Sequence, residues 1–566
     1  MSYLHLVRVT FELLAPLSVG SGQVVKSTRD CNNSVTGKPQ KQDVEAAAIQ
    51  RDPNGLPSVP GASYQGVLRR LALAALGRDK TIELLGIEEG PNSGQTGSVL
   101  CGWGMVHDAH DVAALPTPRG QTNDPVVLCF LAEDAPLWRD HVALNHRHST
   151  DGKKKFARAA VPRGTRFSLE MARFSSLKDD NDLIEMAGLF GHPDFRLGSS
   201  RARGYGRIKV IRASHECCAL TDPMAIRRRR NEPPSNGLPV NLLNNITFSR
   251  SRNETTVATI SLSAIGLLRF GAAKEIAGLW TVGTDGAENG TKGARSVTTW
   301  SDPFQTVQAD RRTKDGNVLR LLTEPFIRYS NGTIAEVVAK QSTEPVDGDQ
   351  YKNYRFPVPG SAIRGPLAHR TLFWWNKANG RNVDAAAADR DATLQRLSDA
   401  TQRPEALAAF LGNAKGPAGT NGAPSSGRAG RVIVDDALIT ATHVLSVDHA
   451  SIDRFTGGVR DRTGALFAEE TLVKSTLEIT VRIHAADAPK KAPGASVDLI
   501  DGWSPDVATA LLKALRDLCA GRLPLGARSL GACSGSVSWS GTAAAAWRNK
   551  CRELKVPLSA KDEAQK

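Results

Sequence analysis

The sequence predicts an α+β protein that contains two copies of one domain, on the basis of three observations. Segments that alternate between apolar and polar residues interleave with helix-like segments, and several strand pairs have no helix between them. A series of short motifs occurs twice in the same order. The chain has 566 residues, several times the roughly 150 residues expected of one domain.

Strands are expected where apolar residues recur with a period of two, or where β-branched and aromatic residues gather. These segments are Leu4–Leu14, Arg166–Met171, Val257–Leu268 and Thr476–Ile483. Helices are expected where apolar residues recur with helical spacing. These segments are Gly66–Leu76, Leu367–Trp375, Ala385–Ala400 and Pro505–Leu518. Each half therefore combines strands and helices, which suggests a sheet covered on one face.

The repeat is clearest in a Pro-Gly motif that precedes a helix-like segment in each half. It spans Val59–Arg69 in the first half and Val358–Leu367 in the second. Further matches follow in the same order: Leu84–Gly86 with Phe410–Gly412, Val106–Ala109 with Val434–Ala437, His141–Asp151 with His449–Gly457, and Leu197–Arg201 with Leu525–Ser529. We therefore expect one domain over residues 1–225 and a second over residues 256–566.

A basic linker is expected between the two domains. The run Arg227–Arg230 is followed by Pro233-Pro234 and Asn236-Gly237, which predicts a proline-containing linker over residues 226–255. The second half separates its opening strand from its Pro-Gly motif far more widely than the first half does, which indicates an insertion near 273–346. A stretch rich in Gly, Ala, Pro and Ser predicts a flexible loop near 414–430.

Composition argues against several classes of protein. The hydrophobic fraction of 40% and the charged fraction of 23% are near the globular average. No apolar run is long enough to span a membrane, and Met1–Leu14 alternates like a strand rather than a secretory signal. The 8 cysteines are scattered without a C-x-x-C pair, so we expect no disulfide framework and a reducing, cytoplasmic setting. A net charge of +14 favours an anionic partner.

The segment Leu197–Val210 combines glycines with arginines in a way that suits phosphate. Its glycines at 198, 204 and 206 permit positive φ and close backbone approach to a ligand. Arg201, Arg203 and Arg207 add donors that can hold phosphate oxygens in pairs. A dinucleotide fingerprint is the alternative, but its glycine spacing differs and a strand rather than a helix is expected to follow.

The Pro-Gly motif places polar residues at the start of a helix in each half. Free N–H groups at a helix N-terminus bind phosphate, and glycine allows close approach. A plain strand-to-helix turn remains the alternative interpretation. The candidates for phosphate contact in this motif are Gly61, Ser63, Gln65 and Arg69, with Ser361 and Arg364 in the second half.

The order of these motifs resembles the RAMP superfamily, the repeat-associated RNA-binding proteins of CRISPR systems. The resemblance rests on Leu17–Gly22, Asp52–Gly55, Val59–Gly66 and Gly204–Arg207. It also rests on Ser451–Gly458, continued to Ala465–Phe467, which is similar to the region before the thumb hairpin of the family. More narrowly, the chain resembles a backbone subunit of type III effector complexes. Two copies in one chain resemble the fused double-backbone subunit of subtype III-D.

The resemblance implies a ferredoxin-like, RRM-related fold with a thumb-like β-hairpin in each half. Such subunits stack along a CRISPR guide RNA and contact target single-stranded RNA and other effector subunits. Contacts that read backbone and shape fit an aromatic content of only 5%. Further RNA-binding candidates that follow from the resemblance are Lys153, Lys154, Arg454, Arg460 and Arg528.

The resemblance also implies cleavage of target RNA with Mg²⁺ or Mn²⁺, bound only together with RNA. The family uses an Asp in the loop between the first strand and the Pro-Gly motif. Asp43 is the first candidate for catalysis and metal binding, and Asp30 is the second. Glu45 fits the distance better but is the wrong residue type. In the second half Asp347 is the candidate, and Asp310, Asp315 and Asp349 remain possible.

Three alternatives stay open at this point. The protein can be a scaffold of the same complex without cleavage. It can be a metal-independent endonuclease that processes CRISPR RNA by acid–base chemistry, for which His141, His146 and His148 are the candidates. More distantly, it can be a single-stranded RNA-binding module outside CRISPR systems.

Overall fold

In the computed structural model, the described residues are 2–32, 39–90, 93–114, 122–131, 137–144, 150–221, 255–271, 318–319, 324–329, 336–338, 354–381, 403–413, 429–441, 443–450, 452, 456, 458, 466–486, 500–526 and 531–564. Several predictions fall outside them. These are the linker at 226–255 except residue 255, most of the insertion at 273–346, nearly all of the loop at 414–430, and the helix at 385–400.

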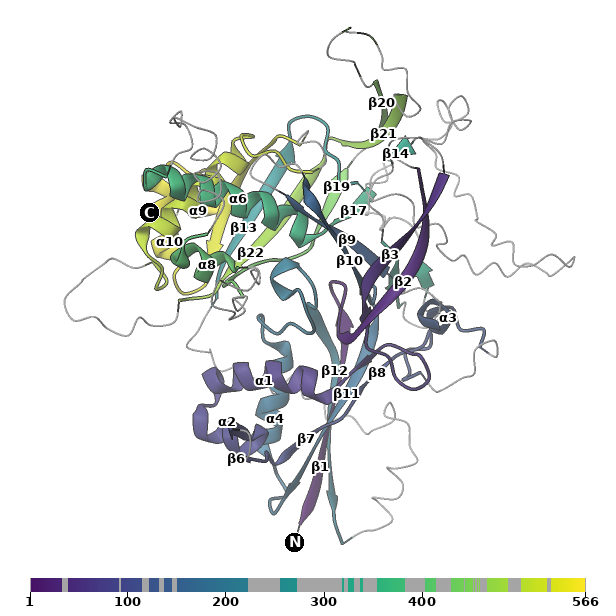
Figure 1. Ribbon diagram of the computed structural model, residues 1–566. Helices are drawn as coiled ribbons and strands as arrows, with labels where there is room; N and C mark the ends of the chain where they lie inside the picture. The colour runs from purple at the N-terminus through teal and green to yellow at the C-terminus, as the bar shows by residue number, and fades with distance from the viewer. Residues whose placement is uncertain are drawn as a thin grey trace, which may run out of the picture.

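The first half forms an antiparallel sheet with helices on one face. Its strands are β1 (Tyr3–Leu13), β4 (Ser58–Val59), β7 (Val99–Cys101), β8 (Gly104–Val106), β11 (Arg166–Ser175) and β12 (Ile208–Ala219). They lie in the order β12-β1-β11-β8-β4, and β7 also pairs with β11. Helices α1 (Gly61–Ala75), α2 (Arg78–Leu85) and α4 (Asn181–Gly188) lie together on one side of this sheet (Figure 1).

The second half forms another antiparallel sheet. Its strands are β13 (Thr256–Ala264), β17 (Tyr354–Val358), β18 (Val432–Val434), β19 (Ala437–Ala441), β22 (Thr476–Ile483) and β23 (Cys533–Ser540). They lie in the order β17-β19-β22-β13-β23, and β18 also pairs with β22. The helices of this half are α6 (Gly360–Ala378), α8 (Glu405–Leu411), α9 (Pro505–Cys519), α10 (Ala544–Glu553) and α11 (Ala560–Glu563). The first four gather on one side of the sheet in Figure 1.

The two sheets correspond strand for strand. In each, the first strand of the half lies inside the sheet and pairs with two strands that flank one helix. Strands β11 and β12 flank α4, and β22 and β23 flank α9. In each sheet, a short strand that follows the Pro-Gly helix pairs with the strand next to the first strand. In the first half β7 pairs with β11, with Cys101 opposite Met171; in the second half β18 pairs with β22, with Val434 opposite Val481. Both Pro-Gly motifs start their helix at the glycine, Gly61 in α1 and Gly360 in α6.

This register corrects one of the sequence matches. Val106–Ala109 was matched with Val434–Ala437, but the residues that follow Cys101 and Val434 are Gly102-Trp103 and Asp435-Asp436. The backbone N–H of Gly102 donates to the carbonyl of Glu170 at 2.9 Å, and that of Asp435 donates to Thr480 at 3.0 Å. The strand pairing, rather than the similarity of the residue types, therefore shows which positions of the two halves correspond. By this pairing, Gly102-Trp103 in the first half corresponds to Asp435-Asp436 in the second.

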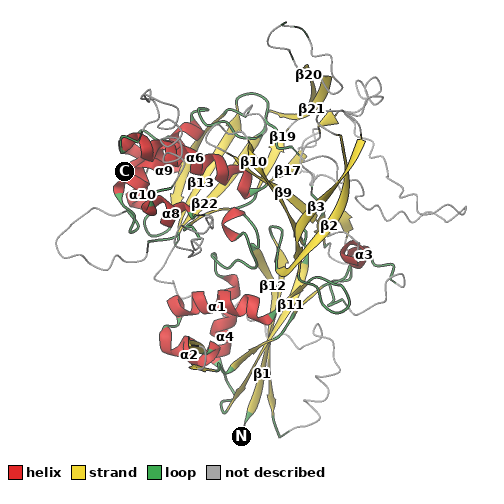
Figure 2. Cartoon of the chain, in the orientation of Figure 1, coloured by secondary structure: helices red, strands yellow, loops and turns green. Residues whose placement is uncertain are grey.

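A third sheet joins the segment that was expected to be an acidic loop with the segment that was expected to form the thumb hairpin. It contains β2 (Gly20–Asn32), β3 (Pro39–Ile49), β9 (Leu137–Leu144) and β10 (Thr150–Ala160), in the order β2-β3-β10-β9. In the second half, β20 (His443–Ala450) pairs with β21 (Leu466–Val473), which also pairs with β14 (Val318–Leu319). Figure 2 shows β20 and β21 extending away from the helices of the second half.

The remaining elements are short. They are β5 (Ile87–Gly90), β6 (Ser93–Gln95), α3 (Pro125–Leu131), β15 (Phe326–Arg328) and β16 (Glu336–Val338), with 3-10 turns at Leu189–Gly191 and Arg201–Arg203. Among the described residues, no helix is both long and apolar enough to cross a membrane.

Each sheet has its own hydrophobic core. Phe11, Phe167 and Phe130 lie in the core of the first half, and Leu511 and Trp547 lie in that of the second. Alternation explains the strands: in β22, every second residue from Leu477 to Ile483 is buried. Helix α9 buries most of its Ala and Leu side chains against the second sheet, as its helical apolar spacing predicts.

Candidate nucleic-acid interface

The glycine turn of the first half, residues 197–207, has the backbone that its glycines predict. Gly198, Gly204 and Gly206 have φ values of 71°, 96° and 76°, a region that side chains with a Cβ rarely adopt. The backbone N–H of Leu197 donates to the carbonyl of Gly206 at 2.9 Å, which closes the turn. The sequence therefore identified a real constraint on the backbone.

The turn approaches the second half of the chain. A Cβ added to Gly204 would lie 1.9 Å from Oδ1 of Asp436. That same oxygen accepts the backbone N–H of Gly360, at the start of α6, at 2.8 Å. The carboxylate of Asp436 therefore accepts the first N–H of α6, the kind of group that the Pro-Gly motif predicts to bind phosphate.

Replacing Gly204 with alanine is expected to weaken the junction between the two halves. The positive φ alone costs a residue with a Cβ about 1–3 kcal/mol, and the contact with Asp436 adds to this. Gly66→Ala is the matched control, because no atom lies within 4 Å of the added Cβ and the site is inside α1. Urea unfolding should show a loss of stability for Gly204→Ala and little change or a gain for Gly66→Ala; equal midpoints would contradict the expectation.

Asp435 is the centre of a buried ion cluster at the junction. Arg196 of the first half donates from Nη2 to both carboxylate oxygens, at 3.1 and 3.3 Å, and Arg482 donates from Nε at 3.0 Å. Nη1 of Arg207 lies 3.9 Å away. Burial by itself raises the pKa of Asp435, but the three guanidinium groups outweigh it and hold this pKa below its usual value. Asp435 is thus ionised and ties two distant segments together.

Asp436 has a second set of partners. Its Oδ2 lies 2.6 Å from Nη2 of Arg139, which is only 4% exposed and also holds the carboxylate of Glu324 from Nε and Nη2 at 2.5 and 2.7 Å. The guanidinium of Arg139 lies 5.0 Å from the ring centre of Tyr205, a residue of the glycine turn. Burial raises the pKa of Asp436, while Arg139 opposes that rise. Arg139 thus links the turn, β9 and the second half.

Residues 324–329, inside the insertion expected in the second half, pack against the first half. The backbone N–H of Ile327 donates to the carbonyl of Arg163 at 2.9 Å, and Ile327 belongs to the first hydrophobic core. Tyr329 donates from its hydroxyl to the carbonyl of His107 at 3.4 Å, and Arg166 lies over its ring at 4.3 Å. The two halves therefore share structure that the expected domain boundaries separate.

The three arginines of the glycine turn differ in how they meet solvent. Arg201 is exposed, whereas Arg203 is half-buried and lies 5.6 Å from the ring centre of Phe156. Arg207 is 38% exposed and faces Asp435. Arg158 donates to the hydroxyl of Ser199 at 2.9 Å on the same turn. Arg201 is therefore the arginine of this turn best placed to meet a polyanion.

Several phosphate-binding candidates of the Pro-Gly motifs donate hydrogen bonds to carbonyl groups at the ends of neighbouring helices. Arg69 donates to the carbonyls of Leu85 and Gly86, where α2 ends, and Gln65 donates to Leu85 at 3.5 Å. In the second half Arg364 donates to the carbonyl of Leu411, where α8 ends. Of the other candidates, Ser63 and Ser361 are half-buried, and Gly61 is buried with the carbonyl of Cys101 beside it. Contact of these residues with RNA stays a prediction.

The expected acidic loop of the first half is a two-stranded ribbon. Strand β2 pairs antiparallel with β3, so that Thr28 pairs with Asp43 and Asp30 pairs with Lys41. The fold thereby brings the backbone positions of both candidate aspartates to one stretch of the ribbon. Asp347 and the RNA-binding candidates Arg454, Arg460 and Arg528 lie outside the described residues.

The lysine-rich strand β10 continues this ribbon. It runs parallel to β3, with Ala157 opposite Ala46. Lys153 and Lys154 lie on β10 before Ala157, and Asp43 lies on β3 before Ala46. The sheet therefore brings a basic strand alongside the strand that carries the first catalytic candidate.

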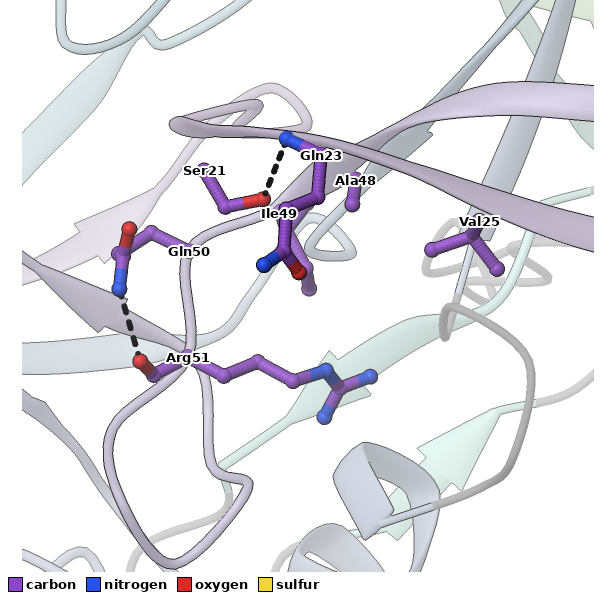
Figure 3. Close-up of a pocket in the computed structure, with 7 residues that line it drawn as sticks. All are labelled: Ser21, Gln23, Val25, Ala48, Ile49, Gln50 and Arg51. Carbon is purple, nitrogen blue, oxygen red and sulfur yellow. Dashed lines mark hydrogen bonds between the residues drawn. The ribbon is translucent and has the colours of Figure 1, made fainter.

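A pocket of about 410 Å³ lies at the base of the ribbon (Figure 3). It is lined by Ser21, Gln23, Val25, Ala48, Ile49, Gln50 and Arg51. The guanidinium of Arg51 donates to the carbonyl of Phe130 at 2.6 Å and to that of Gly55, so it holds the Asp52–Gly55 turn. Among the described side chains, no group of three His, Cys, Asp or Glu residues could hold a metal ion.

His141 is poorly suited to acid–base chemistry. Its ring is buried, stacks on Phe156 at 5.0 Å, and its Nε2 lies 3.1 Å from the hydroxyl of Tyr205. Burial, with help from the charges of Arg203 and Arg139, lowers the pKa of His141 to about 3. The imidazole is therefore neutral at ordinary pH. His146 and His148 lie outside the described residues.

In comparisons with known proteins, one family model matches a segment of the second half. Residues 345–533 match the model of the RAMP superfamily. One solved structure, described as a cryo-EM structure of the Type III-B Cmr-beta bound to cognate target RNA, contains a chain that is 15% identical, with a TM-score of 0.24. That match covers 38% of the present chain and 60% of the other chain. No curated protein matches the sequence.

Proposed function

We propose that the protein is an RNA-binding subunit of a type III CRISPR ribonucleoprotein, built from two ferredoxin-like RAMP domains. The RAMP match over residues 345–533 carries this proposal. The first sheet lies outside that match, yet it has the same strand order, with the first strand central and a helix between the corresponding strands. That order, βαββαβ with the last strand beside the first, supports a ferredoxin-like fold in both halves.

Guide RNA and target single-stranded RNA are the proposed ligands, and other subunits of the effector complex are the proposed protein partners. The basic strand β10 beside the β2–β3 ribbon supports RNA contact, as does the exposed Arg201. The hairpins β9–β10 and β20–β21 occupy equivalent places in the two halves and are the proposed thumbs. A fused double-backbone subunit of the subtype III-D kind and a cytoplasmic setting remain parts of the proposal.

Cleavage of target RNA with a divalent metal is the finer part of the proposal. Carboxylate oxygens are the ligands that Mg²⁺ and Mn²⁺ prefer, and Asp43, with Asp30 on the paired strand, would supply them. When bound, the ion supplies positive charge beside the scissile phosphate. The protein positions the RNA backbone through its basic strand and ribbon. A scaffold without cleavage is the remaining alternative, and the neutral His141 disfavours the metal-independent one.

Reversing the charge of Arg201 is expected to weaken guide RNA binding about tenfold at moderate salt and to lower the salt slope of the binding constant by about one. Arg201→Glu should act equally on guides of any sequence, because a phosphate contact carries no base information. Arg78→Glu is the matched control, since Arg78 is also an exposed arginine and lies at the start of α2. Filter binding of guide RNA across a salt series measures both; identical affinities for Arg201→Glu and Arg78→Glu would rule out this contact.

A further inference from the structure

A second basic surface lies in the second half, on the helices α6 and α9. It surrounds a pocket of about 680 Å³. The lining residues are Arg370, Phe373, Trp374, Arg516, Asp517, Ala520, Arg522, Lys555 and Pro557. We call this the α6–α9 pocket. Cations outnumber carboxylates in this lining, so the pocket suits an anionic ligand.

Asp517 fixes the groups of the α6–α9 pocket in place. Its carboxylate is 1% exposed and accepts from Nε of Arg370 at 2.7 Å, from Nε1 of Trp374 at 2.8 Å and from Nε of Arg522 at 3.0 Å. Each guanidinium donates here through one nitrogen, Nε. Arg522 is 55% exposed, and Lys555, on the same rim, is also exposed. The buried carboxylate thereby orients cations toward solvent without using up their donors.

Aromatic rings lie among these cations. Lys513 and Lys377 place their ammonium groups 5.3 and 5.4 Å from the ring centre of Trp374. The guanidinium of Arg370 lies 5.0 Å from the ring centre of Phe373, and Phe373 is 48% exposed. An exposed flat ring beside cations can stack a base while the cations hold phosphate.

Among the described residues, α1 of the first half lacks the aromatic pair that α6 contributes to this pocket. Helices α1 and α6 begin at equivalent glycines, Gly61 and Gly360. Counting from them, the positions of Phe373-Trp374 correspond to Ala74-Ala75. Contacts that both domains make with a guide RNA do not need this aromatic pair, because α6 has it and α1 does not. The pocket therefore points to a separate contact.

We propose that the α6–α9 pocket binds single-stranded nucleic acid, with a base stacked on Phe373 and phosphates held by Arg522 and Lys555. The chain is poor in aromatic residues, with 5% overall, yet α6 carries Phe373, Trp374 and Trp375 in sequence. An acidic protein segment would use the cations but would leave the exposed ring without a role. A nucleotide uses both, which is why nucleic acid is the ligand that the pocket fits best.

The test uses the full chain carrying Arg201→Glu, so that the proposed guide contact is already weakened. Binding of a fluorescein-labelled oligouridylate is measured by fluorescence anisotropy, and a 5-iodouridine version is crosslinked and mapped. Phe373→Ala should weaken binding about 5- to 150-fold, and Arg522→Ala with Lys555→Ala should lower the salt slope by about 1.4. Crosslinks should map to residues 370–377 or 513–522.

Lys550→Ala is the matched control, because Lys550 is a nearby surface lysine that already contacts Glu553 at 2.6 and 2.7 Å. Circular dichroism checks that each variant is folded; Phe373 is exposed, so its truncation should leave folding intact. Unchanged affinity in folded variants, or crosslinks only in the first half, would overturn the proposal. The proposal would also be overturned if the substitutions in the α6–α9 pocket abolished binding of an acidic protein partner but left RNA binding intact. These outcomes do not depend on whether Arg201→Glu affects guide binding, so the two proposals fail separately.

Discussion

Replacing Asp435 with alanine is expected to destabilise the protein by about 3–5 kcal/mol, the largest stability effect that the structure indicates. The change would leave Arg196, which is 3% exposed, and the half-buried Arg482 without their shared carboxylate. Removing one member of a buried ion cluster costs much more than the cluster contributes net, because the desolvated partners remain. Urea unfolding followed by tryptophan fluorescence measures the loss.

Glu553→Ala supplies the control for Asp435→Ala. Glu553 also pairs with a cation, Lys550, but it is 61% exposed, so its removal should change stability by less than about 1 kcal/mol. A further variant, Asp435→Leu with Arg196→Met, removes charge from both sides and should recover part of the loss. If Asp435→Ala and Glu553→Ala had the same free energy of unfolding, the junction between the two halves would not depend on this ion cluster.

The same cluster sets a pH dependence. The pKa of Asp435 is lower in the folded protein than in the unfolded chain, so the unfolded chain takes up its proton first as pH falls. The stability from Asp435 is therefore present above about pH 4, the unfolded value, and is lost as pH falls below it. The difference in stability between wild type and Asp435→Ala should shrink in that range.

Local signals predicted several elements closely, although α1 and α6 begin at Gly61 and Gly360, ahead of the predicted starts at Gly66 and Leu367. Thr476–Ile483 is a strand with the predicted bounds, and Pro505–Leu518 is one residue short of α9. The repeat match of Leu84–Gly86 with Phe410–Gly412 has a structural basis, because Gly86 and Gly412 follow the last residues of α2 and α8 with positive φ. Such features depend on neighbours within a few residues, which a single sequence displays.

Partners distant along the chain were not predictable in the same way. The sequence showed that the glycine turn needs a close neighbour but not that this neighbour is Asp436, which follows Gly204 by more than two hundred residues. Phosphate and carboxylate are both anions, and the same N–H groups and arginines suit either. The ion cluster of Arg196 with Asp435 likewise has no sequence signature, because two ordinary charges become a site only when folding buries them together.

The ribbon β2–β3 shows another limit. The resemblance implied a loop between the first strand and the Pro-Gly motif, yet Gly20–Asn32 and Pro39–Ile49 are paired strands. Pairing depends on the backbone and on the neighbouring β10 rather than on a local apolar pattern. The consequence for the site is direct, because pairing places Asp30 and Asp43 on adjacent strands rather than at unrelated points of a loop.

The ribbon makes the catalytic candidates separable by experiment. In the assembled complex with Mg²⁺ and complementary RNA, Asp43→Asn is expected to slow target cleavage about 100-fold or more, because charge supplied by a bound metal is worth several kcal/mol in the transition state. Guide RNA binding should remain, since the amide replaces the carboxylate at the same size. Asp30→Asn tests the second candidate on the paired strand. Glu45→Gln is the matched control, two residues along β3 and exposed.

A change of metal preference would assign the ligand itself. Thiolate is a poor ligand for Mg²⁺ and a better one for softer ions, so Asp43→Cys should cleave little in Mg²⁺ and recover in Mn²⁺. A residue that only orders the ribbon would not alter metal preference, because strand pairing does not distinguish the two ions. Full activity of Asp43→Asn with loss in Glu45→Gln would move the role along β3 to Glu45. Unchanged cleavage in all three conservative variants would leave the first domain as a scaffold, with any cleavage assigned to the second domain and Asp347.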